Sequence, residues 1–381
     1  MRILLVAMCD SVHTARWVEQ LHGSEVEFVL FPSTPNRRLH PRLKMRILDT
    51  SDRLVTMNKR DRILAFPLGL LDLVLGNRIR SRRVAHVLRT GTFDMVHLLE
   101  TQHAGYLFHE AKKKGVPDIP VALSLWGSDL NWFGHMAKHR SRIADTLSKV
   151  DWLFVECQRD VELARGFGYK GKVSPPIPAS GGVGTLADIS GFDDSRPPSE
   201  RTSIVVKGYT GFVGKADVAL RVLGSLATQL RGRPIHFYSV SVFMSLRLRL
   251  VRRKTGLDIR THRKKTLSHH EVLELFRSAR ISLSLSLSDG LPGSMREAAW
   301  TGAFPIESKG SCVCEWTQSG IGVLVVDPNN DQEITDAVLR ALEDDDLVDR
   351  AVEINRGMVL GLATEKVRET TLGQYRKAVG Q

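Results

Sequence analysis

Short apolar runs recur through the first half of the chain, separated by amphipathic stretches of helical length. The runs are rich in Val, Ile, Leu and Phe, and they cover residues 3–8, 26–31, 95–99, 121–125 and 152–155. Runs of this kind are typical of buried strands, and their alternation with helical patterns is typical of βα units in a parallel sheet. The pattern therefore predicts a doubly wound α/β domain.

The same alternation resumes after a stretch rich in Gly, Ser, Pro and Asp. That stretch, residues 179–202, has the composition of an inter-domain linker. Beyond it, the pattern predicts strands over 203–206, 235–240 and 281–287, and a helix over 216–230. The expected organisation is a first domain, a linker, a second domain and a terminal helix crossing back to the first, at residues 1–178, 179–202, 203–362 and 363–381.

Composition narrows the class of protein. The 381 residues carry 54 Lys and Arg against 42 Asp and Glu, a net charge of +12, which favours anionic partners such as nucleic acid, sugar nucleotides or acidic lipid. No run reaches the roughly 18 apolar residues of a membrane span, and the first apolar run is too short for a signal peptide. The four cysteines show no CxxC pair, so reduced thiols in a cytoplasmic protein are expected.

The most informative stretch follows the predicted strand at 281–287. A tight turn leads into a helical pattern, and its residues are Ser288, Asp289, Gly290, Leu291, Pro292, Gly293 and Ser294. A strand, a turn and a helix start direct backbone N–H groups and a positive helix dipole at one point, which suits a phosphate. It is neither a Walker loop nor a dinucleotide GxGxxG motif, and a purely structural turn would also explain the glycines.

Two acids bracket this turn. Asp289 and Glu297 have seven residues between them, so one lies on the strand-end loop and the other about one turn into the helix. Because carboxylates repel phosphates, hydroxyl groups are their natural partners.

This acid-x7-acid arrangement, together with its continuation over 302–308, 311–312 and 315–316, resembles the GT-B retaining glycosyltransferases of the family-four type, in a bacterial branch. The resemblance implies two Rossmann-like doubly wound domains facing across a cleft, with donor in the second and acceptor in the first. It also implies transfer from a nucleotide sugar with retention of configuration, in which Asp289 faces sugar hydroxyls and Glu297 faces ribose hydroxyls. Asp289 stands where many relatives have Glu.

The resemblance assigns further residues of the donor site. Lys207 and Lys215 match the basic pair that holds the donor diphosphate, and Gly290, Leu291, Pro292, Gly293 and Ser294 form the turn beside it. Two cations there would offset the charge that builds on a departing diphosphate. The alternative is that both lysines are simply solvated. The family more often has Arg at the first position, which binds phosphate in bidentate fashion.

The first domain supplies the expected acceptor side and catalytic groups. Ser11, His13 and Arg16 follow the first strand, where many relatives carry a glycine-rich loop that this chain lacks. His103 matches the family's active-site histidine, although a lone histidine is often a packing or capping residue. Asp129 belongs to a Gly-Ser-Asp signature and would either accept a proton from the acceptor or cap its turn.

Several other features are assigned structural roles. Ser268 and Glu271 have capping-box spacing, so the His269-His270 pair is expected to start a helix. The Asp344 to Asp346 run is expected at a solvated helix junction rather than at a metal. Cys312 and Cys314 lack the further ligands of a closed zinc site. No metal or other cofactor is expected.

Basic clusters interleave cations with apolar residues at 37–46, 78–83 and 247–254. Such segments either lie on an anionic membrane or are solvated helix faces. The apolar run at 68–75, followed by the cations at 78–83, is the expected membrane contact. The clusters are nearly free of aromatics, so nucleic acid is not an expected partner.

The expected protein is a glycosyltransferase that moves a sugar from a nucleotide sugar to a saccharide or lipid-linked acceptor, in bacterial polysaccharide or glycolipid assembly. It would be cytoplasmic or peripheral at the inner face of the membrane. One alternative is a sugar-nucleotide epimerase on the same fold, which needs no acceptor. Another is a basic binding protein without catalysis.

Overall fold

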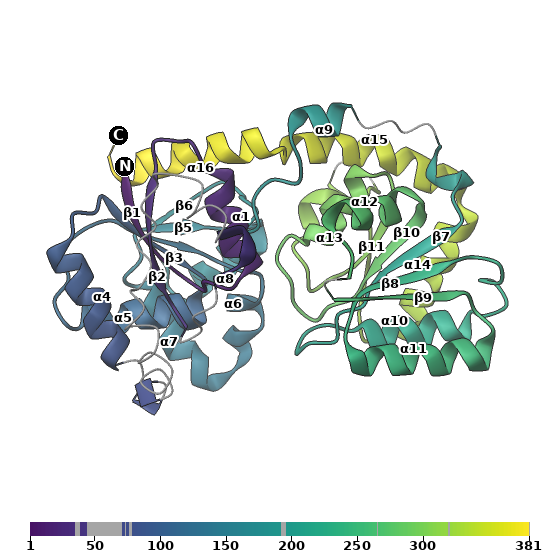
Figure 1. Cartoon of the computed structure of the whole chain (residues 1–381), viewed down its shortest axis with the longest axis horizontal. Coiled ribbons are helices and arrows are strands. Elements are labelled where there is room, and N and C mark those ends of the chain that lie inside the picture. The colour runs from purple at the N-terminus through teal and green to yellow at the C-terminus, as the bar shows by residue number, and fades with distance from the viewer. Residues whose placement is uncertain are drawn as a thin grey trace. The chain divides into compact units, whose positions relative to one another are not determined.

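The structure is a computed structural model (Figure 1). It describes residues 1–34, 39–43, 71–72, 74–75, 78–191, 196–264, 266–318 and 321–380. The expected basic residues at 37–38, 44 and 46, and half of the apolar run at 68–75, lie outside the described residues. The chain divides into two compact units, Met1–Gly182 with Thr364–Gln381, and Val183–Ala363.

The first unit is built on a parallel sheet with the strand order β2-β1-β3-β4-β5-β6. Its strands are β1 (Arg2–Ala7), β2 (Glu27–Pro32), β3 (Met95–Leu99), β4 (Val121–Ser124), β5 (Trp152–Phe154) and β6 (Lys172–Val173). Its helices are α1 (Val12–Gln20), α4 (Arg78–Thr90), the π-helix η1 (Thr101–Gly105), α5 (Tyr106–Lys112), α6 (Ser128–Asn131), the 3-10 helix η2 (Phe133–His135), α7 (Ala137–Leu147), α8 (Gln158–Gly166) and α16 (Thr364–Ala378).

Both faces of this sheet are covered by helices, as alternate residues of β1 show. Leu4 and Val6 belong to a core shared with α4, α5 and α7, whereas Ile3 and Leu5 belong to a second core. Side chains alternate between the two faces of a strand, so a strand that is buried throughout must be covered on both sides. The second core includes Tyr375 of α16, which places the last helix of the chain against the first sheet.

The second unit repeats this plan, with the parallel strand order β12-β11-β10-β7-β8-β9. Its strands are β7 (Ser203–Lys207), β8 (Ile235–Val240), β9 (Ile259–Arg263), β10 (Ala279–Ser284), β11 (Phe304–Ser308) and β12 (Leu324–Val326). Its helices are α9 (Leu186–Ser190), η3 (Pro198–Glu200), α10 (Ala216–Ser225), α11 (Val242–Thr255), α12 (His269–Arg277), α13 (Gly293–Trp300), η4 (Cys314–Thr317), α14 (Asp331–Glu343) and α15 (Asp345–Gly361). The stretch expected to be a linker therefore carries α9 and η3.

Strands β6, β9, β11 and β12 are absent from the sequence prediction. The omission of β11 has a clear cause, because Pro305 lies inside it and proline usually marks an edge strand. Here β11 lies between β10 and β12, with Pro305 opposite Ser282. The flanking Phe304 and Ile306 are completely buried, and their burial stabilises the strand despite the missing N–H.

Two predicted helix boundaries, the start of α12 and the junction before α15, are confirmed. Ser268 and Glu271 form a reciprocal capping box at the start of α12. Asp344 accepts a hydrogen bond from the backbone N–H of Leu347 (2.9 Å) and caps α15, so the acidic run is a helix junction as predicted. Among the described residues, no helix has the length and apolar character needed to cross a bilayer.

Candidate functional site

The turn between β10 and α13 ends in a helix start that is open to an anion. Pro292 occupies the N-cap position and makes no side-chain capping bond, and the first turn of α13 has no acidic residue. The first N–H groups of a helix lack intrahelical partners and carry the positive end of its dipole. The predicted strand, turn and helix start are confirmed here, with Gly290, Leu291, Gly293 and Ser294 in or next to the turn.

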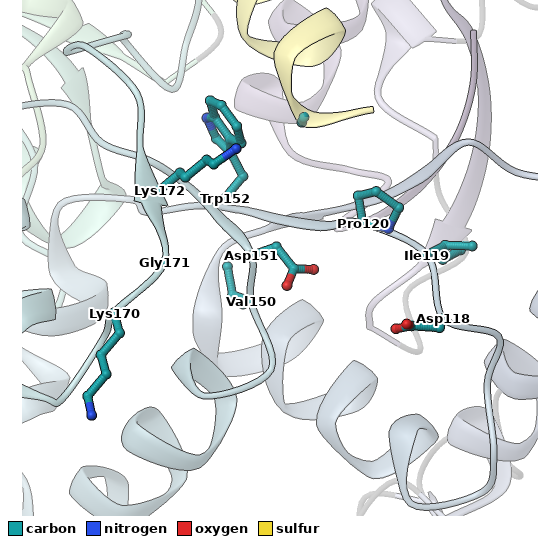
Figure 2. Close-up of a pocket in the computed structure, with 10 residues that line it drawn as sticks. Asp118, Ile119, Pro120, Val150, Asp151, Trp152, Lys170, Gly171 and Lys172 are labelled. Atoms are coloured by element: carbon teal, nitrogen blue, oxygen red, sulfur yellow. The ribbon is translucent and has the colours of Figure 1, made fainter. Parts of the chain in front are cut away.

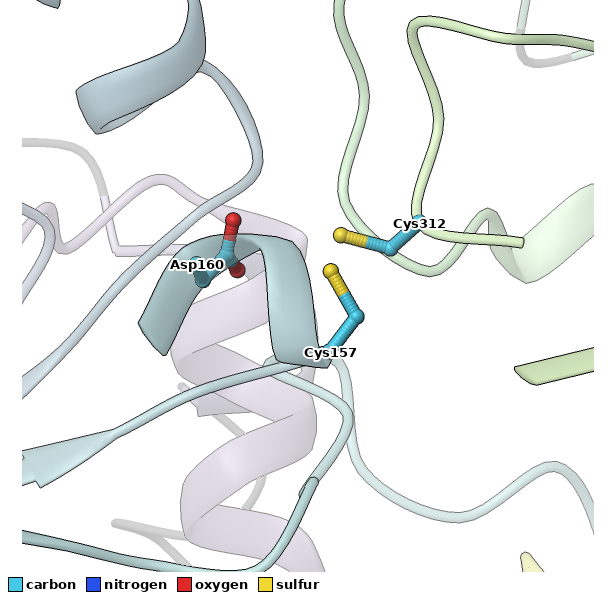
Figure 3. Close-up of side chains that lie close together, drawn as sticks. All are labelled: Cys157, Asp160 and Cys312. Atoms are coloured by element: carbon cyan, nitrogen blue, oxygen red, sulfur yellow. The ribbon is translucent and has the colours of Figure 1, made fainter. Parts of the chain in front are cut away.

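Backbone hydrogen bonds fix this turn against the loop after β11. Asp289 N–H donates to Gly310 O (3.1 Å), and Cys312 N–H donates to Gly290 O (3.0 Å). Figure 3 shows the Cys312 side chain on this loop. An added Cβ at Gly310 would come within 2.4 Å of Leu287 O, so the close approach of the two loops requires glycine. The helix start is therefore held rigidly relative to the sheet.

Lys207 and Asp289, both predicted donor-site residues, are directly bonded. Lys207 ends β7, and its Nζ donates to Asp289 Oδ2 at 3.0 Å. The other Asp289 oxygen, Oδ1, accepts from Gly290 N–H at 3.0 Å. Burial alone would lower the pKa of Lys207, but nearby acidic groups, Asp289 first, raise it above its usual value. Lys207 is therefore a fixed cation beside the open helix start.

Lys215, the second predicted cation, is tied to the same turn through its backbone. It precedes α10, and its N–H donates to Leu285 O (2.9 Å), while the preceding Gly214 forms a bridge with Ser286. A Cβ at Gly214 would lie 2.4 Å from Tyr209 O, so only glycine fits. The loop after β7 and the loop after β10 are thus joined at one edge of the sheet.

Two buried groups that the sequence prediction did not include lie next to Lys207. Tyr238 on β8 is paired in register with Lys207. Glu307 on β11 is completely buried, and this burial raises the pKa of its carboxyl group to about 8, a shift that Lys207 opposes and Asp289 increases. The position of Glu307 was hidden because β11 was not predicted, whereas β8 was predicted but its register beside β7 was not.

Glu297 lies in α13, and its Oε1 is 2.9 Å from His269 Nε2. Most of its side chain is buried, with an exposed fraction of 12%. His269 was expected only to begin a helix, and it does so, but it also orients the carboxylate that was expected to bind ribose. Sequence offers no signal for this contact, because 28 residues separate the pair.

In the first unit, His103 lies in the π-helix that follows β3. Its backbone N–H donates to both carboxylate oxygens of Glu100 at 2.9 Å. Desolvation, and then the Arg80 guanidinium, lowers the pKa of His103 below its usual value. The imidazole is therefore held neutral, with its side chain accessible to solvent.

Asp129 and Glu100 are two buried carboxyl groups in the first unit. Asp129 Oδ2 accepts from Thr101 N–H (2.9 Å), Thr101 Oγ1 (3.1 Å) and Trp126 N–H (3.1 Å). Burial, followed by the charge of Glu100, raises the pKa of Asp129, and burial raises that of Glu100 to about 7. Asp129 thus connects the segments that follow β3 and β4. This is the structural, turn-capping role that the sequence analysis gave as one of its two alternatives.

Glu100 was not among the predicted site residues, and its backbone has an unusual conformation in the structure. It has a φ of 77°, a left-handed conformation that is rare for a side chain larger than Asn. This conformation lets its carboxylate cap the π-helix by accepting from His103 and Ala104 N–H groups. Backbone strain of this kind is frequent near functional sites.

The predicted acceptor residues lie at the start of α1. Ser11 is the N-cap, and its Oγ accepts from His13 N–H at 3.1 Å. The exposed His13 ring lies 5.1 Å from the Trp126 ring, so it stands near the end of β4. Arg16 is half-buried on α1. Ser11 thus has a structural role, and its neighbours present side chains at the carboxyl edge of the sheet.

A cavity of about 680 Å³ lies at the opposite edge of the first sheet (Figure 2). Its lining includes Asp118, Asp151 and Lys170, which precede β4, β5 and β6, and therefore mark the amino ends of these strands. Ligands of open parallel sheets bind at the carboxyl ends. The cavity is consequently separate from the predicted acceptor residues.

The cysteines divide into two groups. Cys9 and Cys314 are free thiols, as predicted. Cys157 is the buried residue before α8, whose Asp160 donates its N–H to Cys157 O at 3.2 Å (Figure 3). For Cys157 and Cys312, which belong to different units, the reduced state stays a prediction.

Comparisons with known proteins bear on the fold and on the class of protein. Residues 244–358 match the family model described as Glycosyl transferases group 1. A search of curated proteins found no match. Among solved structures, the chain is similar to HepE from Anabaena in complex with UDP-glucose, with 10% identity, a TM-score of 0.69, and coverage of 99% of this chain and 100% of that one.

The chain has the GT-B fold. Two further GT-B structures are similar over nearly their whole length. Sucrose-phosphate synthase from Thermosynechococcus elongatus has 14% identity and a TM-score of 0.65, with coverage of 100% of this chain and 99% of that one. The UDP-forming alpha,alpha-trehalose-phosphate synthase from Burkholderia vietnamiensis has 14% identity and a TM-score of 0.69, with coverage of 99% and 100%. At these identities the likeness concerns the fold, and the predicted cleft between the domains stays a prediction.

Proposed function

We propose that the protein is a glycosyltransferase that transfers a sugar from a nucleotide sugar to a saccharide or lipid-linked acceptor, with retention of configuration. The observation that carries the proposal is the uncapped start of α13, with Lys207 bonded to Asp289 beside it. The group 1 match over residues 244–358 supports the reaction class. Similarity to a UDP-glucose complex supports the donor class.

The donor diphosphate would take the place of the missing helix cap. Its oxygens would accept the free N–H groups at the start of α13 and the ammonium of Lys207, with Lys215 contributing a second cation. Hydrogen bonds to charged groups contribute about 1.5–3 kcal/mol each, so this set would supply a large part of the binding free energy of the donor. As the glycosidic bond breaks, the same groups would stabilise the charge on the leaving diphosphate.

The carboxylates would select the rest of the donor. Glu297, held by His269, would accept hydroxyl hydrogens of the ribose. Lys207 would bind the phosphate in place of Asp289, and Asp289 would accept a hydrogen bond from a sugar hydroxyl. His103, neutral at physiological pH, would hydrogen-bond the transferred sugar or the acceptor, and Asp129 would keep the π-helix that carries His103 in place.

The pathway proposed for this reaction is the assembly of a bacterial surface polysaccharide or glycolipid. The acceptor side would be formed by His13 and Arg16 on α1. A metal is not required in this scheme, because the helix start and two lysines supply the positive charge. Growth of the saccharide would take place at the carboxyl edge of the first sheet.

A thermal-shift titration tests the donor site. The wild type is titrated with a panel of nucleoside diphosphates and nucleotide sugars, beside Glu297→Ala and the control Glu353→Ala, which removes an exposed carboxylate on α15. Ligand at a hundredfold excess over Kd stabilises the native state by about 2.7 kcal/mol, so a clear rise in Tm is expected. The rise should shrink in Glu297→Ala and persist in Glu353→Ala.

The same panel separates transfer from its rivals. Incubation of the stabilising nucleotide sugar with candidate acceptors, followed by mass spectrometry, should show a glycosylated product and free nucleotide. Conversion of the nucleotide sugar in the absence of an acceptor would indicate an epimerase. Absence of any Tm shift at millimolar nucleotide would contradict the donor site and favour a protein without catalysis.

A further inference from the structure

The outer face of α11 exposes an apolar stripe. Val242, Phe243, Leu246 and Leu250 have exposed fractions of 65%, 72%, 53% and 64%. At 3.6 residues per turn these positions fall within a sector of about 100° of the helix surface. Isolated exposed apolar residues are ordinary, but four large ones on one stripe of a single helix indicate a surface with a partner.

The opposite face of α11 explains why the stripe points outward. Met244 and Leu248 are completely buried in the core of the second unit, together with residues of α10 and β8. Figure 1 shows α10 and α11 side by side along one face of that sheet. The helix is therefore anchored by one apolar face, and the sheet fixes the direction of the other.

Cations flank the stripe on both sides. The 14 residues of α11 include five basic residues and no acid: Arg247, Arg249, Arg252, Arg253 and Lys254. On the helical wheel, Arg249 and Arg252 lie on one side of the apolar sector and Arg247 and Lys254 on the other. Arg247 is 4.0 Å from Asp217, a weak exposed pair. The neighbouring edge strand β9 adds the exposed Arg260 and Arg263.

We propose that α11 is a membrane-contacting helix that lies flat on a bilayer containing anionic lipid. The apolar stripe would enter the boundary between headgroups and acyl chains, and the flanking arginines would meet the lipid phosphates. The helix is about 21 Å long, so it lies in the interface rather than crossing it. The proposal does not rest on glycosyl transfer, because no residue of α11 belongs to the donor site.

Two other occupants fit the same face less well. In a symmetric dimer the same patch meets itself, which would place the five cations of one copy against those of the other. Nucleic acid would satisfy the arginines, but its phosphate backbone offers no apolar surface for Phe243 and Leu246. Of these three occupants, only a lipid surface supplies both negative charge and an apolar layer.

Vesicle co-sedimentation of the full chain tests the proposal. The wild type is mixed with vesicles of phosphatidylcholine alone and with vesicles of an equimolar mixture of phosphatidylcholine and phosphatidylglycerol. Two double variants, Phe243→Ser with Leu246→Ser and Arg249→Gln with Arg253→Gln, are compared with Ile321→Ser and Arg340→Gln, which remove an exposed apolar residue and an exposed cation elsewhere in the second unit. Thermal melting establishes that each variant is folded.

The wild type and both controls are expected to sediment with anionic vesicles and to remain in solution with phosphatidylcholine alone. Each double variant should bind anionic vesicles about 30-fold more weakly, because each loses two groups that contact the membrane. A cation near the membrane surface and a half-inserted apolar side chain contribute similar free energies of binding. High salt should release the wild type by screening the arginines.

Four results would overturn the proposal. One is equal sedimentation of the folded double variants and the wild type, and another is no sedimentation of the wild type with either vesicle. The third is a dimer in light scattering that dissociates in the Phe243→Ser, Leu246→Ser variant, which would make α11 a subunit interface. The fourth is loss of vesicle binding in the arginine double variant alone, together with binding of the wild type to heparin as strong as its binding to anionic vesicles. That result would assign the helix to a polyanion rather than to lipid.

Discussion

Lys207 Nζ lies 3.0 Å from Asp289 Oδ2, so the cation at the end of β7 is bonded to the carboxylate that precedes α13. The two residues are 82 positions apart, and their exposed side-chain fractions are 27% and 34%. In the proposed reaction a diphosphate replaces Asp289 as the partner of the Lys207 ammonium. The Asp289 carboxylate then becomes available to accept a hydrogen bond from a sugar hydroxyl. Binding of phosphate and recognition of sugar would thus be linked through one ion pair.

Lys207→Met is expected to weaken nucleoside diphosphate binding about 10- to 100-fold, because it removes one hydrogen bond between charged groups. Isothermal titration calorimetry with the nucleotide that stabilises the wild type measures this loss. The control Lys309→Met removes an exposed lysine paired with Asp327 and should bind normally. Equal affinities of the wild type and Lys207→Met would contradict the assignment of Lys207.

Glu307→Gln is expected to stabilise the protein increasingly as pH rises. The pKa of Glu307 is raised by burial to about 8 in the folded state, whereas an unfolded glutamate titrates near 4.5. The unfolded chain therefore ionises first, and the folded state loses stability between about pH 4.5 and 8, on the order of a few kcal/mol. Glutamine does not ionise and escapes this loss.

Urea unfolding of the wild type and Glu307→Gln from pH 4.5 to 8.5 measures the difference in the free energy of unfolding. The difference should grow across this range and level off above about pH 8. A constant difference would show that Glu307 does not take up a proton on folding. Exposed Glu343→Gln on α14 serves as the control and should give no such trend.

His269→Ala is expected to weaken nucleoside diphosphate binding about two- to tenfold, because Glu297 loses the 2.9 Å contact that orients it. Binding of inorganic pyrophosphate should not change, since pyrophosphate has no ribose. His269→Gln retains an N–H donor and should recover part of the affinity. A matching loss of pyrophosphate binding would instead indicate that the start of α13 has been disturbed.

Tyr375→Phe should destabilise the first unit by about 1–3 kcal/mol. The Tyr375 hydroxyl accepts from Trp17 Nε1 (2.9 Å) and contacts His97 Nδ1 (2.6 Å), and both partners are completely buried. Phenylalanine keeps the ring in place but leaves two buried polar groups unsatisfied. Chemical denaturation measures the loss, with the exposed Tyr209→Phe as a neutral control. Unchanged stability would imply that water replaces the hydroxyl.

Local signals in the sequence predicted much of the fold. Runs of mostly apolar, buried residues identified β1, β3 and β4, because a strand covered on both faces is largely apolar. The capping box at Ser268 fixed the start of α12. Of the edge strands, β2 was predicted, but β6, β9 and β12 were missed. Strand β9 has little apolar content, because Arg260 and Thr261 are exposed. Pro305 hid β11 for the reason given above.

The site was predictable in part. The turn from Asp289 to Ser294 and the acid at Glu297 are contiguous, so their spacing alone indicated an anion site flanked by carboxylates. Glu100 and Glu307 escaped detection because a glutamate on the sequence looks the same whether it is solvated or buried. Their raised pKa values arise from neighbouring strands and helices that sequence does not reveal.

The sequence by itself determined eight of the strands, where α12 and α13 begin, and which turn offers free N–H groups, because each of these depends on residues within a few positions. Only the tertiary structure decided that Lys207 meets Asp289, that His269 meets Glu297, and that α11 turns four apolar side chains outward. Parallel strands bring their carboxyl ends to one edge whatever the distance along the chain, and burial depends on what packs alongside. These contacts are therefore properties of the folded sheet and not of any local stretch.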